Sequence, residues 1–220
     1  VVAIDLSGMG DSEHRQNYSQ TLYGEEIKAV CDDMNWDSAD FLAHSMAGPI
    51  SVKAASTYPE LFKSLFLLDS IIIVPPDKAR SFSGRGSMVR TDFVYEDLDS
   101  AVESFRLIPP QPCRHDFLLK HIAVNSFKET EAGWMLKSDG LIMKTYQYED
   151  LTDIFMNLKC PIYLVYGLMS QIFSQEILDY TKYVGNLSEE AVIGIPGAMH
   201  HLFIDEPIVF VEEIKKLLKK

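Results

Sequence analysis

The chain has 220 residues, of which 47% are hydrophobic, and its formal net charge is −12. This length allows one globular domain with a sizeable core. The excess of acidic residues disfavours nucleic acid or an anionic membrane as a partner, and no apolar run is long enough to span a bilayer.

The three cysteines Cys31, Cys113 and Cys160 are widely spaced. Their spacing matches neither a metal site nor a disulfide framework, which favours a reducing compartment and a cytoplasmic location. The chain starts inside a buried-strand pattern, Val1-Val2-Ala3-Ile4, without an initiator methionine. The sequence therefore predicts that the chain begins in the middle of a fold, and an N-terminal targeting signal stays open.

Strands and helices alternate over the first 76 residues. The expected segments are a strand over residues 1–6, a glycine-rich loop over 7–12, a helix capped by Ser19, a strand over 41–43, a helix over 49–58 and a strand over 64–68. The helix after Ser19 carries an apolar residue at each turn of one face: Tyr23, Ile27, Val30 and Met34.

The composition changes over residues 77–148, where helical fragments are broken by turn residues and no strand is expected. Alternation resumes with a strand over 161–167, a helix over 175–183, a strand over 191–195 and a last helix from about residue 205. The last helix is expected to bury Ile208, Val211, Ile214 and Leu218. The pattern predicts an α/β sheet in two parts, residues 1–76 and 149–220, interrupted by a helical insertion.

The segment Ala43-His44-Ser45-Met46-Ala47-Gly48 joins a predicted strand to a predicted helix. A serine between small residues at such a turn matches a nucleophile elbow. This geometry exposes Ser45 Oγ and directs the Met46 N–H at a developing oxyanion. The alternative is a serine that caps an ordinary helix, and the motif alone favours neither interpretation.

An activated serine needs a base. His200 and His201 follow the strand predicted at 191–195. Loops at the carboxyl ends of parallel strands meet at one edge of a sheet, so this loop and Ser45 are expected to lie together. The remaining histidines are interpreted as packed or surface side chains: His14, His44, His115 and His121.

Four motifs, in this order, resemble those of α/β-hydrolases of the lipase and esterase type. They are the loop at residues 5–12, the elbow at 44–48, the strand at 160–167 and the loop Pro196-Gly197-Ala198-Met199-His200. The resemblance covers essentially the whole chain and implies an α/β-hydrolase core with the insertion at 77–148 as a mobile helical lid. It assigns Ser45 as nucleophile and His200 as base, and it implies neither a metal nor an organic cofactor.

The acid of the triad departs from the commonest family pattern. Most members carry it just after the strand that corresponds to 161–167, but the loop there reads Gly167-Leu168-Met169-Ser170. A subset of these esterases places the acid one strand earlier, where Asp69 stands, so Asp69 is predicted as the acid. Glu176 is the alternative, and the non-catalytic interpretation of Asp69 is a turn or helix cap.

The first three strands of the family are absent from this chain, together with the His-Gly loop that supplies a second oxyanion N–H. Either the chain is a fragment, or residues 1–6 pair directly with 41–43. With one oxyanion donor missing, the chain is expected to lose about a hundred- to thousandfold in rate. Asp5 and Asp11 are expected to fix the glycine-rich loop through hydrogen bonds.

These expectations lead to a serine hydrolase that cleaves a small, mostly apolar carboxylic ester through an acyl-enzyme. Serine at position 45 disfavours the members with an aspartate nucleophile, such as haloalkane dehalogenases and epoxide hydrolases. The residues expected on the inner face of the lid, against the substrate, are Phe105, Leu107, Trp134 and Met135.

Two alternative functions stay open. One is a C–C bond hydrolase of a ring-opened diketone with the same triad, in which Arg106 or Trp134 serves the substrate carboxylate. The other is a non-catalytic binding protein on this fold.

Overall fold

The computed structural model describes residues 1–78, 92–147 and 149–219, and the chain divides into two compact units. The larger unit comprises Gln20–Gly84 and Tyr148–Lys220, and the smaller unit comprises Val1–Ser19 and Arg85–Gln147. The predicted domain limits at residues 76 and 148 lie beside or within undescribed residues and stay predictions. In the described parts of the chain, no helix combines the length and hydrophobicity that crossing a membrane requires.

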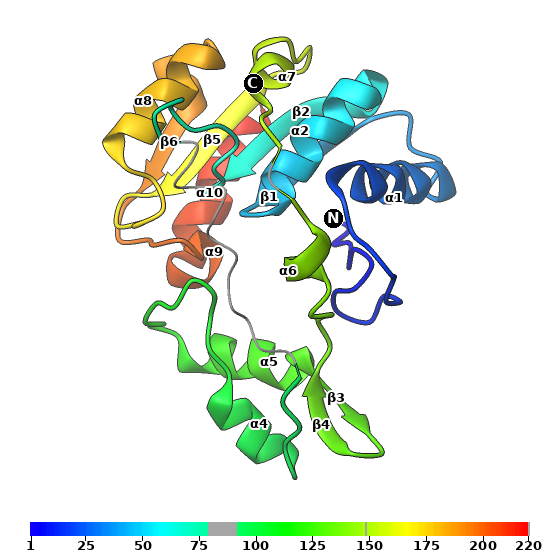
Figure 1. Ribbon diagram of the computed structural model, residues 1–220. Coiled ribbons are helices and arrows are strands. Elements are labelled where there is room, and N and C mark those ends of the chain that lie inside the picture. Colours follow the sequence, from blue (N-terminus) through cyan, green and yellow to red (C-terminus); the bar gives the residue numbers. More distant parts are fainter. Residues whose placement is uncertain (79–91, 148, 220) are drawn as a thin grey trace. The chain divides into compact units, whose positions relative to one another are not determined.

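The larger unit is built around a sheet of four parallel strands in the order β1-β2-β5-β6 (Figure 1). The strands are β1 (Ala39–His44), β2 (Phe62–Leu68), β5 (Ile162–Gly167) and β6 (Val192–Ile195). Leu68 at the end of β2 pairs with His44 on one side and with Val165 on the other. Because all four strands run in the same direction, the loops after them lie at one edge of the sheet.

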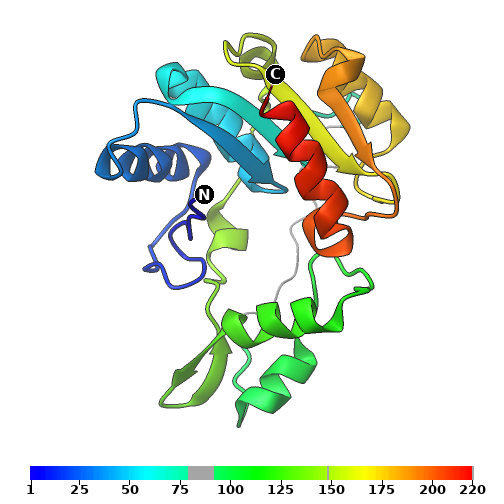
Figure 2. The same ribbon diagram turned by 180° about the vertical axis from the view of Figure 1, so that it is seen from behind.

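Helices cover both faces of this sheet. α2 (Ala47–Thr57) lies over one face with α1 (Gln20–Asp33) packed beside it, and α10 (Pro207–Leu217) lies over the opposite face (Figures 1 and 2). The other helical segments of this unit are η1 (Pro59–Leu61), α7 (Thr152–Met156), α8 (Gln175–Val184), η2 (Glu189–Ala191) and α9 (Leu202–Asp205). A mostly parallel sheet flanked by helices is the fold class predicted from the sequence.

The core lies on both faces of β2. Leu65 and Leu67 are fully buried, and Phe66 and Leu68 are buried in the cluster that also contains residues of α10. Side chains of a strand alternate between its two faces, so one short apolar run supplies both layers. A near-continuous apolar run of this kind is typical of a parallel strand covered on both sides.

The last helix buries a different stripe from the predicted one. The sequence pattern predicts a buried face of Ile208, Val211, Ile214 and Leu218. All of these except Ile214 are exposed to 43% or more. Phe210 and Leu217 pack with Ile214 against the sheet instead. Both stripes have helical spacing, so the sheet surface that the helix meets decides which of them is buried.

The predicted face of the first helix needs a smaller correction. Tyr23 and Ile27 are buried, as expected. The helix ends at Asp33, and Met34 beyond it is 42% exposed. Cys31, four residues after Ile27, continues the buried face because residues i and i+4 lie on the same side of a helix.

The smaller unit contains two strands that the sequence does not predict. β3 (Phe127–Thr130) and β4 (Gly133–Leu136) form an antiparallel hairpin. The helices described in this unit are α4 (Leu98–Ser104), α5 (Asp116–Ser126) and α6 (Ile142–Thr145). The expectation of no strand in this stretch is wrong, because strands of four residues are too short to give a clear alternation of apolar and polar side chains.

Residues 1–6 do not form a strand in the described structure, and all of them except Leu6 are exposed. The predicted strand is therefore wrong, and so is its pairing with residues 41–43, since the described partner of β1 is β2. An apolar sequence gives strand propensity, but a strand also needs a neighbour for its hydrogen bonds. The expected role of Asp5 in the loop is confirmed, because its Oδ2 accepts the Asp11 N–H at 3.1 Å.

Candidate active site

Ser45 lies in the tight turn between β1 and α2. Its backbone adopts φ +53°, a left-handed conformation that is uncommon for a residue with a side chain. The Ser45 N–H donates to the Leu68 carbonyl at 3.1 Å, which ties the turn to the end of β2. The small residues that the elbow motif needs two positions before and after the serine are Ala43 and Ala47. A Cβ atom at the next residue, Gly48, would collide with Ser70 Oγ, so this position has no room for a side chain either. The predicted elbow is present.

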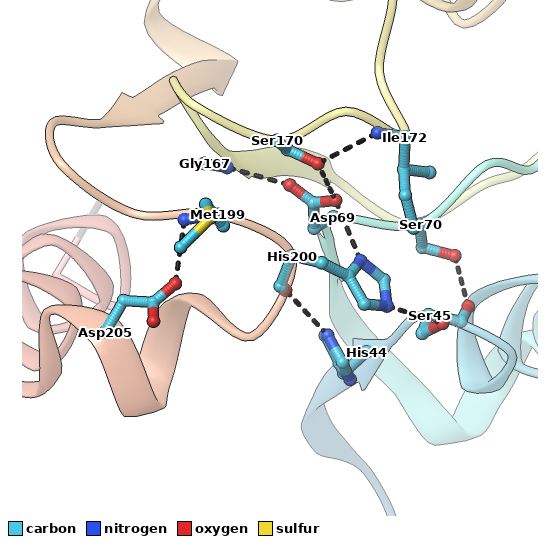
Figure 3. Close-up of polar contacts among 10 residues, drawn as sticks. All are labelled: His44, Ser45, Asp69, Ser70, Gly167, Ser170, Ile172, Met199, His200 and Asp205. Atoms are coloured by element: carbon cyan, nitrogen blue, oxygen red, sulfur yellow. Dashed lines mark hydrogen bonds and ion pairs between the residues drawn. The ribbon is translucent and has the colours of Figure 1, made fainter. Parts of the chain in front are cut away.

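His200 stands in the loop between β6 and α9, and its side chain is almost fully buried. Its Nε2 lies 3.0 Å from Ser45 Oγ, and its Nδ1 lies 3.0 Å from Asp69 Oδ1 (Figure 3). A carboxylate can only accept a hydrogen bond, so Nδ1 carries the proton and Nε2 accepts from the serine hydroxyl. The structure thus brings Ser45, His200 and Asp69 together in the order predicted from the sequence.

Asp69 directly follows β2 and is completely buried. Its φ of +43° is the second left-handed conformation at this edge of the sheet. Besides His200, two groups at and just beyond the end of β5 donate to the carboxylate: the Gly167 N–H to Oδ2 at 2.8 Å and the Ser170 hydroxyl to Oδ1 at 2.7 Å. A buried charge is tolerated when its hydrogen-bond acceptors are used, and all three donors contribute to that here.

Strand alternation turns His44 away from Ser45, but the loop that carries His200 folds over that side of β1. His44 Nε2 donates to the His200 carbonyl at 2.9 Å, and the two ring centroids are 4.6 Å apart. Burial lowers the pKa of His44 to about 4, although the hydrogen bond to His200 opposes this shift. His44 is therefore a neutral imidazole near pH 7 that holds the His200 loop in place.

Sequence reasoning missed two groups of this site. The sequence from Gly167 to Ser170 contains no carboxylate, so it does not mark the Gly167 N–H or the Ser170 hydroxyl as part of a triad. The hydroxyl and the amide contact Asp69 across the sheet edge, because the β2 and β5 strands are neighbours. The signal in the sequence that points to them is their position: Gly167 ends, and Ser170 follows, a strand that leads to the same sheet edge as the strand before Asp69.

The alternative acid does not reach the site. Glu176, in the first turn of α8, forms an ion pair with Lys78, and its side chain is 52% exposed. Met46 stands at the N-cap of α2, so its N–H has no acceptor within the helix. That N–H is the donor expected for an oxyanion, and its catalytic role stays a prediction.

The four predicted lid residues all belong to the smaller unit. Leu107 is buried, the ring of Phe105 lies 6.4 Å from that of Phe127, and Trp134 and Met135 are part of β4. Their contact with a substrate stays a prediction. Arg106 uses one guanidinium nitrogen, Nη1, to donate to the carbonyls of Glu103 and Phe105.

Within the described ranges, no group of three or more His, Cys, Asp or Glu side chains is arranged to hold a metal ion. The observed side chains can do other chemistry. A hydroxyl whose proton faces a neutral imidazole, which in turn is held by a carboxylate, is the arrangement that activates a serine for attack on an acyl carbon. A buried position keeps water from competing for these hydrogen bonds.

Residues 1–207 match the family model described as the alpha/beta hydrolase fold. The chain belongs to the α/β-hydrolase fold family. The match includes Ser45, Asp69 and His200, which we call the Ser45 cluster. It confirms the resemblance drawn from the four sequence motifs.

Three of the similar proteins have esterase or hydrolase in their names. The pimeloyl-[acyl-carrier protein] methyl ester esterase of Wigglesworthia glossinidia brevipalpis is 24% identical over 221 residues, which cover 99% of this chain and 82% of that protein. The 2-(acetamidomethylene)succinate hydrolase of Mesorhizobium japonicum is 23% identical over 99% of this chain and 77% of its own length. A serine hydrolase-like protein of Danio rerio is 27% identical over 100 residues, and the chain spans less than a third of that relative, 31%.

Solved structures of α/β-hydrolases have the same fold. The structure of E-2-(acetamidomethylene)succinate hydrolase superposes with a TM-score of 0.81 at 19% identity, covering 98% of this chain and 80% of that one. An esterase from Mycobacterium tuberculosis gives a TM-score of 0.80 at 21% identity, covering 99% and 74%. The family and these relatives support a hydrolase.

Proposed function

We propose that the protein is a serine hydrolase that cleaves a small, mostly apolar carboxylic ester through an acyl-enzyme. The observation that carries this proposal is the continuous chain of hydrogen-bond distances from Ser45 Oγ through His200 to Asp69, each 3.0 Å long. A serine at an elbow, a buried imidazole and a buried carboxylate in this order have one well-understood use, which is acyl transfer.

In the first half of the reaction, Ser45 Oγ attacks the ester carbonyl carbon while His200 Nε2 takes its proton. The Met46 N–H stabilises the negative charge on the former carbonyl oxygen. His200 then gives the proton to the alkoxide as the carbon–oxygen bond of the ester breaks, and the alcohol leaves. Asp69 stabilises the imidazolium during both proton transfers and keeps the ring oriented.

In the second half, a water molecule attacks the acyl carbon while His200 takes one of its protons. The bond between Ser45 Oγ and the acyl carbon breaks, and the serine recovers its proton from His200. The carboxylic acid leaves and the site returns to its starting state.

One observation and one prediction support an ester as the substrate. A relative that aligns with nearly the whole chain is a methyl ester esterase by its name. The predicted substrate contacts in the lid are apolar or aromatic (Phe105, Leu107, Trp134 and Met135), which suits an uncharged acyl or alkyl group. The lid, and the contact of these four residues with the substrate, are part of what we propose.

A C–C bond hydrolase that acts on a ring-opened diketone bearing a carboxylate, with the same triad, is the second candidate. The observation in its favour is the relative whose name is 2-(acetamidomethylene)succinate hydrolase, which aligns with 99% of this chain. Arg106 is a weaker carboxylate ligand than its charge suggests, because its Nη1 already donates to two backbone carbonyls. Comparing turnover of neutral esters with turnover of ring-opened diketone acids distinguishes the two candidates.

The test is covalent labelling with a fluorophosphonate, followed by mass spectrometry of the labelled peptide. We expect the label on Ser45 and its loss in Ser45→Ala, with a drop in kcat on the order of 10⁶-fold for any ester that the protein turns over. Ser64→Ala is the matched control, because Ser64 is another buried serine of the same sheet, bonded to Asp40. A label at a different serine would overturn the assignment of Ser45 as the nucleophile, and an unlabelled protein would support the non-catalytic alternative.

A further inference from the structure

Ser170 shares one oxygen atom with the imidazole of His200. Its hydroxyl donates to Asp69 Oδ1 at 2.7 Å, and His200 Nδ1 lies 3.0 Å from the same oxygen (Figure 3). The Ile172 N–H donates to Ser170 Oγ at 3.3 Å. The serine hydroxyl thus accepts on one side and donates its only proton to the carboxylate on the other.

The remaining carboxylate oxygen is used as well. Asp69 Oδ2 accepts the Gly167 N–H at 2.8 Å, and the Asp69 side chain has no solvent exposure. The carboxylate orientation is therefore set by donors from the last residue of β5 and from the loop that follows it, although Asp69 itself follows β2. Without the Ser170 hydroxyl, Oδ1 would have the imidazole as its one described partner.

A hydrogen bond to a carboxylate stabilises its negative charge and makes the oxygen a weaker acceptor for any further proton. Two donors on Oδ1 divide its negative charge between them. The imidazolium form of His200 gains less from such a carboxylate than from one that His200 holds alone. Neutral His200, the form that acts as the base, then persists to lower pH.

We propose that Ser170 is a positioning residue for the Ser45 cluster and that it acts through Asp69. It holds Oδ1 against His200 Nδ1, and it extends the pH range in which His200 is a base toward acid. The labelling test of this inference rests on the proposed function. The hydrogen bonds from which the inference is argued are independent of that function.

Two other imidazoles face His200. His44 packs on its ring from the end of β1, and the His201 ring centroid lies 4.9 Å away. Neither is changed by a substitution at residue 170. A difference between the wild-type protein and a Ser170 variant therefore reports on Asp69 and His200.

The experiment measures the rate of fluorophosphonate labelling of Ser45 between about pH 4.5 and 9. Four variants are compared with the wild type: Ser170→Ala, Ser170→Val, Ser170→Thr and the control Ser64→Ala. Threonine keeps the hydroxyl, and valine has the same shape without it. If Ser170→Ala impairs folding, the comparison of Ser170→Val with Ser170→Thr therefore still tests the proposal. Ser64→Ala removes an equivalent bond, from a buried serine to Asp40 Oδ1 at 2.6 Å, at the opposite ends of the strands.

We expect the acidic limb of the profile to move toward higher pH by about 0.5–1 unit in Ser170→Ala and Ser170→Val. The plateau rate should fall less than about tenfold, since the Gly167 N–H still holds Asp69. Ser170→Thr and Ser64→Ala should follow the wild-type limb. A merely structural role of Ser170 would lower the plateau without moving the limb, and that result would overturn the proposal.

A second readout separates this proposal from the proposed function. The His200 ring can be titrated by NMR of the ¹⁵N-labelled protein, which requires no catalysis. If Ser45 is not labelled at any pH, the proposed function is wrong, but the Ser170→Val titration should still move to higher pH relative to Ser170→Thr. Identical titration curves for these two variants would refute the role of Ser170 whatever the activity.

Discussion

Each unit of the molecule contains a cluster of one hydroxyl, one imidazole and one carboxylate, and the two clusters differ in order. In the larger unit the imidazole of His200 stands between Ser45 and Asp69. In the smaller unit the carboxylate of Asp139 stands between the other two groups. Its Oδ2 accepts the Tyr18 hydroxyl at 2.6 Å and lies 3.6 Å from His14 Nδ1.

The order decides what each hydroxyl can do. Ser45 faces an imidazole nitrogen, whereas Tyr18 faces a carboxylate, which is a weaker base than an imidazole. Burial raises the pKa of Tyr18, and its hydrogen bond to Asp139 adds to the shift. Burial also raises the pKa of Asp139, but hydrogen bonds from Tyr18 and from the Leu141 N–H, together with nearby positive charge, outweigh it, so the net shift of this pKa is downward. Tyr18 therefore keeps its proton, and its cluster is structural.

The two clusters also differ in how deeply their side chains are buried. The side chains of His200 and Asp69 are 4% and 0% exposed, whereas those of His14 and Asp139 are 39% and 13% exposed. Hydrogen bonds to charged groups are stronger where water is excluded. The cluster at the carboxyl edge of the parallel sheet thus combines the order and the burial that the proposed reaction requires, and the cluster of the smaller unit has neither.

The largest effect is expected from a substitution of Asp69, the carboxylate of the cluster in the larger unit. Asp69→Asn keeps the shape of the side chain but removes its charge, so the imidazole loses the partner that fixes its tautomer. We expect kcat to fall by up to about 10⁴-fold with little loss of folding. Steady-state kinetics with a neutral ester, and thermal unfolding of the same variant, measure the two quantities.

Asp205→Asn is the matched control for that variant. Asp205 is also a buried aspartate of the larger unit, but its carboxylate accepts the Met199 N–H at 2.8 Å rather than contacting the His200 ring. An asparagine oxygen can still accept that bond, so kcat should change far less than in Asp69→Asn. Normal turnover of Asp69→Asn would show that another group is the acid.

The next largest effect concerns His44, the buried imidazole beside the cluster of the larger unit. The folded protein keeps His44 neutral down to its pKa of about 4, whereas the unfolded chain takes up a proton near its ordinary pKa of 6.5. Between these values the unfolded state binds more protons, so the free energy of unfolding falls as pH falls through this window and levels off below about pH 4. The difference amounts to about 3 kcal/mol.

Chemical denaturation at pH 7 and pH 4.5 measures this loss. His44→Gln keeps an amide that can donate to the His200 carbonyl but cannot take up a proton. The variant should lose about 2–3 kcal/mol less than the wild type on acidification. His121→Gln, at an exposed histidine, controls for the removal of one histidine. Equal acid losses in His44→Gln and the wild type would contradict the predicted role of His44.

The smallest effect tests the cluster of the smaller unit. Tyr18→Phe removes the hydroxyl that donates to Asp139 and accepts the Arg15 N–H at 2.8 Å. We expect a loss of about 1–2 kcal/mol in the free energy of unfolding, because a buried hydrogen bond disappears. The rate of fluorophosphonate labelling of Ser45 should stay within about twofold. A large loss of labelling without a loss of stability would give Tyr18 a direct role in the reaction.

The sequence by itself determined the fold class and the three residues of the candidate site. Strand-helix alternation is a local property, and it fixes which loops leave the same edge of a parallel sheet. Ser45, Asp69 and His200 each follow a strand, and the resemblance of the sequence motifs to those of α/β-hydrolases selected these three among the residues of their loops. The predicted strands over 41–43, 64–68, 161–167 and 191–195 are confirmed for the same reason.

Only the tertiary structure decided which partners complete these elements. Residues 1–6 have the composition of a strand, but no neighbour supplies its hydrogen bonds in the described structure. The last helix has two apolar stripes, and contact with the sheet selects the one that contains Phe210.

The contacts around Asp69 depend on the tertiary structure in the same way. Ser170 reaches Asp69 because β5 lies next to β2 and because Asp69 adopts a left-handed backbone conformation. Hydrogen bonds across a sheet edge depend on the dihedral angles of two loops at once, and a one-dimensional pattern of residues does not contain that information.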